Sequence, residues 1–184
     1  MKRLLDIVLS LAALLLLSPL LLLTALAVLL ETGRPVFFRQ VRIGRGDREF
    51  GMYKFRSMRQ DSAATGPYFT AASDPRITRV GRWIRRTSID ELPQIINVLT
   101  GEMSLVGPRP DVPVQRALYA PADWQERCSI RPGITGLAQV MLRSEGTDAQ
   151  RQALDLRYVR ESSVWLDFKI MWLTLGRLSG KGSN

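Results

Sequence analysis

The 184-residue sequence contains no histidine and only one cysteine, Cys128. A chain without histidine cannot build a Ser-His-Asp triad or a histidine metal site, and a single cysteine cannot close an intrachain disulfide. Cys128 has no evident base beside it in the sequence, so we do not expect a reactive thiol. Carboxylates therefore remain the main candidates for a nucleophile.

Acidic residues are also scarce, with 17 Asp and Glu against 26 Lys and Arg and a formal net charge of +9. This excess implies an anionic partner, which can be nucleic acid, acidic lipid headgroups or a phosphorylated substrate, and charge alone does not choose among them. The length suits one domain, because about 150 residues remain to build a core once the apolar N-terminus is set aside.

The N-terminus carries an almost wholly apolar run, from Ile7 to Leu30. As a straight helix this run reaches roughly 36 Å, enough to cross a hydrocarbon core of ~30 Å. Ser18 and Pro19 lie at its midpoint, where the proline removes a helical hydrogen bond and predicts a kink. The Ser18 hydroxyl can bond a carbonyl that Pro19 frees.

Basic residues flank this apolar run on both sides. Lys2 and Arg3 precede it. Five arginines follow it: Arg34, Arg39, Arg42, Arg45 and Arg48. The positive-inside tendency draws both ends to the cytoplasmic side, so we expect a re-entrant helix over residues 1–33, broken at Ser18-Pro19. An ordinary spanning anchor with a tolerated proline, and a signal peptide cleaved near Ala25-Leu26-Ala27, remain alternatives.

The rest of the chain, residues 34–184, is expected to form a cytoplasmic, membrane-associated domain. Its fold class is mainly α with a small β-hairpin, in which Val36–Val41 and Phe50–Phe55 alternate as strands around a glycine-containing turn. The stretch between Arg59 and Arg79 lacks apolar periodicity and is expected to be a surface loop, with Asp61–Pro67 as a lid.

The C-terminal part, Asp148–Leu178, has the pattern of a helix interrupted around Ser162-Ser163. Its last section, Val164–Leu175, is very apolar but too short to span a membrane. It suits an interfacial amphipathic helix with tryptophans at headgroup depth, although a buried core helix fits the same pattern. Gly180–Asn184 is expected to be a disordered end.

Asp90 and Glu91 form an acidic pair in a basic neighbourhood. Such a pair can bind a metal ion and an anionic substrate together, because the cation and the arginines offset the substrate's charge. The alternative is a capping box, since Ser88-Ile89-Asp90-Glu91 has the form Ser-x-x-Glu. Pro93 counts against it, because a helix capped by Ser88 would hold the proline at its fifth position. A helix that begins at Pro93 leaves both carboxylates just outside it, near its positive end.

Four further residues are candidates for binding phosphate or substrate: Arg85, Arg109, Arg131 and Gln139. Arg109 lies between Pro108 and Pro110 in a stiff loop that presents the guanidinium with little ordering cost. Arg131 and Gln139 bound a glycine-containing loop that suits backbone contacts to a ligand. Simple turns at both loops, and a solvated face near lipid headgroups for Arg85, remain open.

Together these motifs resemble the small monotopic phosphoglycosyl transferases of bacteria, also called the bacterial sugar transferase family. The matching motifs are the basic N-terminus with its Ser18-Pro19 helix, Tyr53–Met58, Asp90–Gln94, Gly107–Pro110 and Arg131–Gln139. The resemblance implies transfer of a sugar phosphate from a UDP-sugar to undecaprenyl phosphate, with release of UMP. It also implies a monotopic catalytic domain on the cytoplasmic face of the bacterial inner membrane, in contact with its lipids.

The resemblance further implies a role for each site residue. Asp90 is the nucleophile that forms a covalent phosphosugar intermediate, Glu91 helps hold Mg²⁺, and Arg109 binds phosphate, with Arg85 a weaker candidate for the same role. Val140–Glu145 stands where many relatives have Asn-Gly-Arg, so the donor sugar is left unassigned. The oligomeric state stays open, a homodimer included.

Two rival functions use the same residues. The charge of +9 is compatible with a membrane-tethered basic module that binds nucleic acid or acidic lipid. No recognised nucleic-acid motif is present, so we expect no nucleic-acid partner. A metal-dependent phosphohydrolase is the other rival, in which the same carboxylates deliver water to phosphorus.

Overall fold

The computed structural model describes residues 1–59, 74–142 and 146–178. The predicted lid at Asp61–Pro67, residues 143–145 at the end of the stretch Val140–Glu145, and the predicted disordered end lie outside these residues. The helices and strands are α1 (Lys2–Thr32), β1 (Phe37–Ile43), β2 (Glu49–Phe55), α2 (Arg79–Arg86), α3 (Gln94–Thr100), β3 (Ser104–Val106), α4 (Pro121–Arg127), β4 (Gly133–Thr135), α5 (Leu137–Leu142), α6 (Asp148–Glu161) and α7 (Val164–Leu178). Shorter 3₁₀ turns are η1 (Arg45–Asp47), η3 (Ile89–Glu91) and η4 (Pro113–Leu118).

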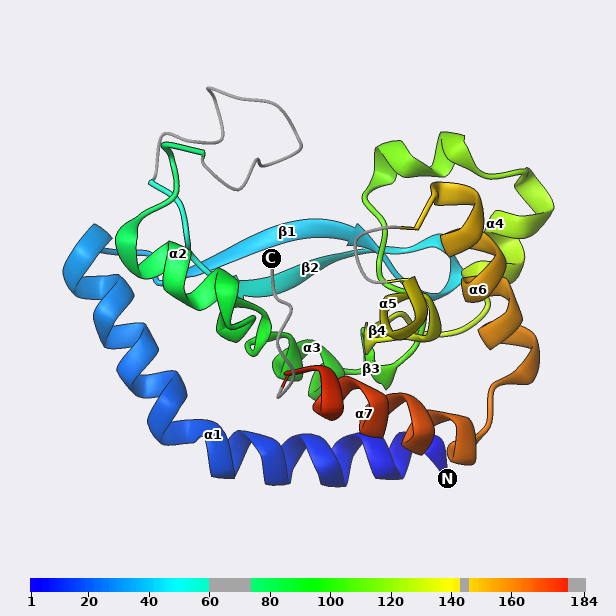
Figure 1. The fold of residues 1–184 in the computed structure, drawn as a ribbon, viewed down its shortest axis with the longest axis horizontal. Coiled ribbons are helices and arrows are strands. Elements are labelled where there is room, and N and C mark those ends of the chain that lie inside the picture. Colours follow the sequence, from blue (N-terminus) through cyan, green and yellow to red (C-terminus); the bar gives the residue numbers. More distant parts are fainter. Residues whose placement is uncertain (60–73, 143–145, 179–184) are drawn as a thin grey trace.

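The expected class, mainly helical with a small hairpin, is confirmed. β1 and β2 pair antiparallel from Phe37 opposite Phe55 to Ile43 opposite Glu49. The turn between them contains Gly46 at φ 71°, a conformation that glycine adopts without steric cost. The hairpin crosses the domain above α3, whereas α1 runs along its lower and left edges (Figure 1).

A second sheet was not predicted. β3 and β4 pair in parallel, with Ser104 opposite Gly133 and Val106 opposite Thr135. The backbones approach so closely that a Cβ atom on Gly133 would lie 2.0 Å from the Gly107 nitrogen. Only glycine permits so close an approach of the two backbones. This approach fixes the position at which the chain leaves β3 and enters the proline-rich loop at residues 108–110.

α1 is a single bent helix with Pro19 inside it (Figure 1). The Ser18 hydroxyl donates to the Leu15 carbonyl at 2.8 Å, the acceptor that Pro19 leaves without its helical N–H. The predicted serine–carbonyl bond is therefore confirmed. Leu15 and Leu16 beside the bend are 79% and 80% exposed. α1 is long and apolar enough to cross a membrane, and a bend of this kind suits both a re-entrant and a kinked spanning helix.

Both arms of α1 are attached to the rest of the chain. On the first arm, Lys2 pairs with Asp167 at 2.5 Å, and Asp6 accepts hydrogen bonds from the Ser104 hydroxyl and the Leu105 N–H. On the second arm, Glu31 accepts from the Arg79 and Val80 N–H groups at the start of α2, at 2.7 and 3.0 Å. The two ends of α1 thus bind to opposite sides of one domain.

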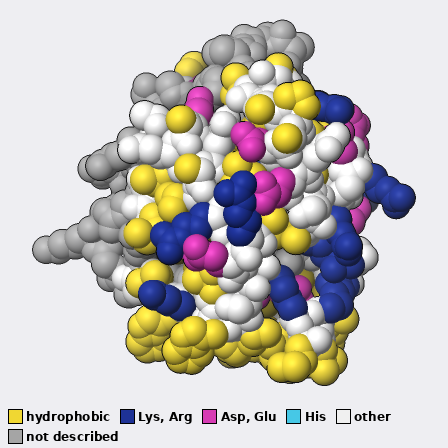
Figure 2. All heavy atoms as spheres, turned by 90° about the vertical axis from the view of Figure 1, so that its right-hand side faces the viewer, with side chains coloured by type: hydrophobic (Ala, Val, Ile, Leu, Met, Phe, Trp, Pro, Cys, Tyr) yellow, Lys and Arg dark blue, Asp and Glu magenta, His cyan; other side chains and the backbone are white. Residues whose placement is uncertain are grey.

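α7 combines the two alternatives that its sequence left open. Ile170 is buried in the core with Val106, Val140 and Tyr158. Trp165 and Trp172, by contrast, are 80% and 76% exposed. In Figure 2 hydrophobic side chains gather along the lower edge of the molecule, the edge that α1 and α7 form in Figure 1. α7 is therefore a core helix with an apolar outer face.

The helix after the acidic pair begins one residue later than expected. Pro93 is the N-cap of α3, and Gln94 is its first residue. The preceding turn uses i→i+3 hydrogen bonds, from Glu91 N to Ser88 O and from Leu92 N to Ile89 O, which delay the first helical turn. Gly101 ends α3 at φ 91°, as its sequence predicted.

Candidate active site

Asp90 and Glu91 lie in the 3₁₀ turn η3, between α2 and α3. Ser88 precedes this turn at φ 56°, and its side chain makes no capping hydrogen bond in the described chain. The capping-box interpretation is therefore wrong. The carboxylates lie outside the regular helix, and their side chains are free to serve another purpose.

Glu91 is held by two cations from distant parts of the sequence. Lys54 Nζ on β2 donates to Glu91 Oε1 at 2.8 Å, and Arg109 Nη2 donates to the same oxygen at 2.7 Å. Burial alone would raise the pKa of Glu91, but the charges of Arg109 and Lys54 outweigh it and hold the pKa well below its usual range. Glu91 is therefore ionised and fixed in place.

Asp90 lies in a different environment although it is the next residue. It is 8% exposed. Burial is the main cause that raises the pKa of Asp90 to about 6, and the adjacent Glu91 charge adds to it, whereas Lys54 and Arg85 oppose the shift. Neighbouring carboxylates with pKa values pushed apart are typical of acid, base or nucleophile sites.

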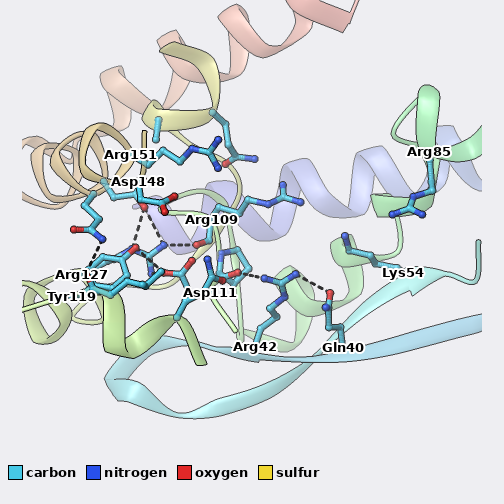
Figure 3. A pocket seen from close by; sticks show the side chains of 17 residues that line it. Gln40, Arg42, Lys54, Arg85, Arg109, Asp111, Tyr119, Arg127, Asp148 and Arg151 are labelled. Atoms are coloured by element: carbon cyan, nitrogen blue, oxygen red, sulfur yellow. Dashed lines mark hydrogen bonds and ion pairs between the residues drawn. The ribbon is translucent and has the colours of Figure 1, made fainter. Parts of the chain in front are cut away.

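Lys54 and Arg109, the two cations that hold Glu91, line a cavity of about 640 Å³ that has two different ends. Figure 3 shows Lys54 and Arg85 at one end and Arg109 near the middle, with Tyr119, Arg127, Asp148 and Arg151 at the other. The first end is basic. The second has mixed charge and many hydrogen-bonding groups, because α6 turns a polar face toward it: Asp148, Arg151, Gln152 and Asp155.

The structure brings half of the six predicted site residues to the wall of this cavity, and Asp90 and Glu91 are not among the residues that line it. Arg85, Arg109 and Gln139 all line it. Arg131 does not, because its Nε donates to the Gly101 carbonyl at 2.7 Å, at the end of α3, where it lines a separate groove. The sequence predicted the rigid loop that carries Arg131. It did not predict that the arginine binds the C-terminal end of α3.

Lys54 was not singled out as a site residue. It lies in the matching motif Tyr53–Met58 and alternates with Tyr53 and Phe55 along β2. The alternation identifies the face on which Lys54 lies. Nothing in the local sequence shows that this face looks onto Glu91, which is 37 positions away.

The residues present fit a magnesium ion only together with a substrate. Among the described residues, no group of three or more His, Cys, Asp or Glu side chains gathers to hold a metal. Mg²⁺ at phosphate sites commonly takes one or two carboxylates and fills its other positions with substrate phosphate and water. Ionised Glu91, with Asp90 beside it, supplies such a partial set.

Comparisons with known proteins agree with the geometry. The family model described as bacterial sugar transferase matches residues 1–181. The chain is 49% identical, over 96% of its length, to an undecaprenyl-phosphate glucose phosphotransferase of Komagataeibacter xylinus, of which it covers 35%. It is 45% identical, over 95% of its length, to a UDP-glucose:undecaprenyl-phosphate glucose-1-phosphate transferase of Escherichia coli K12, of which it covers 39%.

A third relative carries the name of a different sugar. The chain is 44% identical, over 95% of its length, to a UDP-N-acetylgalactosamine-undecaprenyl-phosphate N-acetylgalactosaminephosphotransferase of Aeromonas hydrophila, of which it covers 42%. The chain thus spans well under half of each of these relatives. Because the family model covers nearly all of its length, the chain belongs to the bacterial sugar transferase family.

Proposed function

We propose that the chain is a phosphoglycosyl transferase that moves a sugar 1-phosphate from a UDP-sugar to undecaprenyl phosphate and releases UMP. The observation that carries this proposal is that buried Asp90 lies next to an ionised Glu91, which is held by Lys54 and Arg109 from the wall of a cavity large enough for a nucleotide sugar. Relatives named for this type of reaction support it. The step would begin the assembly of a bacterial polysaccharide or glycoprotein glycan.

The reaction follows from the residues in two steps. In the first, an Asp90 oxygen bonds to the sugar-bearing phosphorus, and the bond from that phosphorus to the UMP oxygen breaks. In the second, an oxygen of undecaprenyl phosphate attacks the same phosphorus and releases the Asp90 carboxylate. No histidine base is needed, since Asp90 is ionised above pH 6 and the lipid phosphate is already an anion.

Charge neutralisation is the main work of the other residues. A carboxylate can approach a diphosphate only where cations offset the repulsion. Lys54 and Arg85 at the basic end of the cavity, with Arg109 near its middle, supply these cations. Mg²⁺, when bound through Glu91, supplies further positive charge to the diphosphate.

We also propose that α1 is re-entrant and holds the domain on the cytoplasmic face of the inner membrane. The attachment of both α1 arms to one domain supports this topology, because a spanning helix would carry one end away from it. The exposed leucines at the bend and the exposed tryptophans of α7 would then meet lipid. Residues 1–33 form the anchor and residues 34–184 the catalytic domain.

Re-entry predicts that both ends of α1 are reached from the same side of the membrane. A cysteine inserted after Met1 and a cysteine replacing Arg34, each in a Cys128→Ser background, should be labelled by an impermeant thiol reagent in inverted membrane vesicles and protected in spheroplasts. Pro19→Ala restores a helical N–H and should move part of the population to a spanning state. If the two introduced cysteines are labelled from opposite sides of the membrane in the protein that keeps Pro19, re-entry is refuted.

The raised pKa of Asp90 predicts a pH-dependent rate. The ionised form is the nucleophile, so activity should be lost as pH falls through about 6. One pH unit below that value, kcat/KM for the donor should be about tenfold below its plateau. The measurement is UMP release between pH 5 and 8 at fixed Mg²⁺, and a flat profile down to pH 5 would contradict the raised pKa of Asp90.

Release of UMP from a panel of UDP-sugars, with and without undecaprenyl phosphate, tests the function itself. We expect repeated turnover to UMP and a lipid-linked sugar diphosphate only when a matching donor and the lipid phosphate are both present, whereas donor alone should release no more than one UMP per enzyme molecule. Free sugar phosphate without the lipid would instead indicate a phosphohydrolase. The same panel identifies the sugar.

A further inference from the structure

The loop that carries Arg109 is held almost entirely through its carbonyl groups. Pro108 and Pro110 have no N–H to donate, so two of the usual anchoring points are missing. Four consecutive carbonyls each accept a hydrogen bond from another element. The donors are Gly133 N–H to Pro108 O at 2.9 Å, Arg127 Nη2 to Arg109 O, Arg42 Nη1 to Pro110 O at 2.8 Å, and Ile43 N–H to Asp111 O at 2.8 Å.

Arg127 of α4 is the most constrained of these donors. It is 5% exposed. Its guanidinium pairs with Asp111 at 3.1 Å and with Asp155 of α6 at 3.0 Å. Its carbon centre lies 5.4 Å from the Tyr119 ring, and the Tyr119 hydroxyl donates to Asp111 at 2.8 Å. Asp155 and the Tyr119 ring therefore fix the guanidinium from outside the loop, and the guanidinium in turn holds the loop at the Arg109 carbonyl and at Asp111 (Figure 3).

This cluster is poorly explained as a device for stability. A buried ion pair often gains little over a well-packed apolar group, because both charges lose their hydration. One guanidinium here faces two carboxylates, and burial raises the pKa of Asp155 to about 6 despite the Arg127 charge. A planar fork with several fixed partners is, however, well suited to holding a backbone in one position.

We propose that Arg127 is a positioning residue for the transfer reaction. It fixes the position of the loop that carries Arg109, so that the Arg109 guanidinium contacts Glu91 and the donor diphosphate. The inference rests on the proposed function. Arg127 need not touch the reacting phosphorus, because the Arg109 backbone lies between them in the chain of contacts. Its effect on the reaction should therefore depend on the presence of the Arg109 side chain.

A double-mutant cycle tests this dependence. Arg127→Met should lower kcat by about 100-fold through misplacement of the loop. Arg109→Met should lower it by about 1,000-fold. The double variant should be no more than about threefold below Arg109→Met alone, because two residues acting through one contact are not additive. A double variant lowered by the product of the two effects would overturn the inference.

Arg160→Met is the matched control, since Arg160 pairs with Glu126 and so also links α6 to α4, but at the surface. It should keep kcat within about twofold, because exposed pairs contribute little. Arg127→Lys is the second variant, used in the same cycle if Arg127→Met does not fold. One ammonium cannot replace the fork, so kcat should still fall and depend on Arg109, and full activity with lysine would overturn the inference.

Failure of this inference and failure of the proposed function give different results. If the wild-type chain releases no UMP from any UDP-sugar, the proposed function fails and the positioning role falls with it. If the wild type is active while the Arg127 and Arg109 effects multiply, only the positioning role fails. Thermal unfolding of each variant, measured in the same detergent, separates loss of the fold from loss of the loop position.

Discussion

Asp90→Asn is expected to reduce UMP release by about 10⁴-fold or more. An amide keeps the size and shape of the side chain but cannot form the bond to phosphorus. The measurement is steady-state UMP release with saturating donor and undecaprenyl phosphate. Because the nucleophile itself is lost, the defect should appear in kcat and should not be recovered by more donor, more Mg²⁺ or higher pH.

The same substitution should leave the fold intact and should not make it less stable. Burial raises the pKa of Asp90 from 3.8 to about 6, so the ionised group at neutral pH costs folding free energy, and a neutral amide removes that cost. The temperature of unfolding at pH 7.5, without Mg²⁺, should therefore rise or stay constant. Asp123→Asn, a substitution of the same kind on α4 outside the cavity, should keep full activity. Substantial turnover by Asp90→Asn would reject the assignment of the nucleophile.

Glu91→Gln is expected to lower kcat by about 100- to 1,000-fold while Asp90 remains present. The amide cannot offer an ionised oxygen to Lys54 and Arg109, which now share Glu91 Oε1, so both cations lose their common anchor. If Glu91 also holds the metal, the Mg²⁺ concentration for half-maximal rate should increase at least tenfold. The measurement is UMP release over a Mg²⁺ titration.

The Mg²⁺ titration separates the two roles of Glu91. A lower kcat with an unchanged Mg²⁺ requirement would leave Glu91 as an anchor for the cations and would remove it as a metal ligand. Glu161→Gln is the control, because Glu161 also pairs with an arginine, Arg157, but on an exposed face of α6. That variant should match the wild type in rate and in Mg²⁺ dependence.

Local features of the fold were predictable because their causes lie within a few residues. Pro93 and the turn before it set the acidic pair outside α3, and the Leu15 carbonyl freed by Pro19 finds the adjacent Ser18 hydroxyl. The hairpin followed from alternation around a glycine turn. In each case the chain itself supplies both partners, so a short stretch of sequence contains the whole physical reason.

Features that depend on distant contacts were not predictable in the same way. The short parallel pair β3–β4 exists because Gly107 and Gly133 let two backbones meet, and three-residue strands carry no periodic signal. Lys54 and Arg127 belong to the site only through partners far along the chain. Arg131 was predicted to bind a ligand, because its local sequence gives a stiff loop but does not show that its guanidinium donates to the distant Gly101 carbonyl.

The decisive measurement is the intact mass of the protein after incubation with its UDP-sugar and Mg²⁺ in the absence of undecaprenyl phosphate. A covalent intermediate predicts an added mass of one sugar phosphate, located at Asp90 by peptide fragmentation, absent from Asp90→Asn, and removed when the lipid phosphate is supplied. If the enzyme turns over when donor and lipid phosphate are both supplied, but stays unmodified with donor and Mg²⁺ alone, the two-step mechanism and the role of Asp90 in it are contradicted.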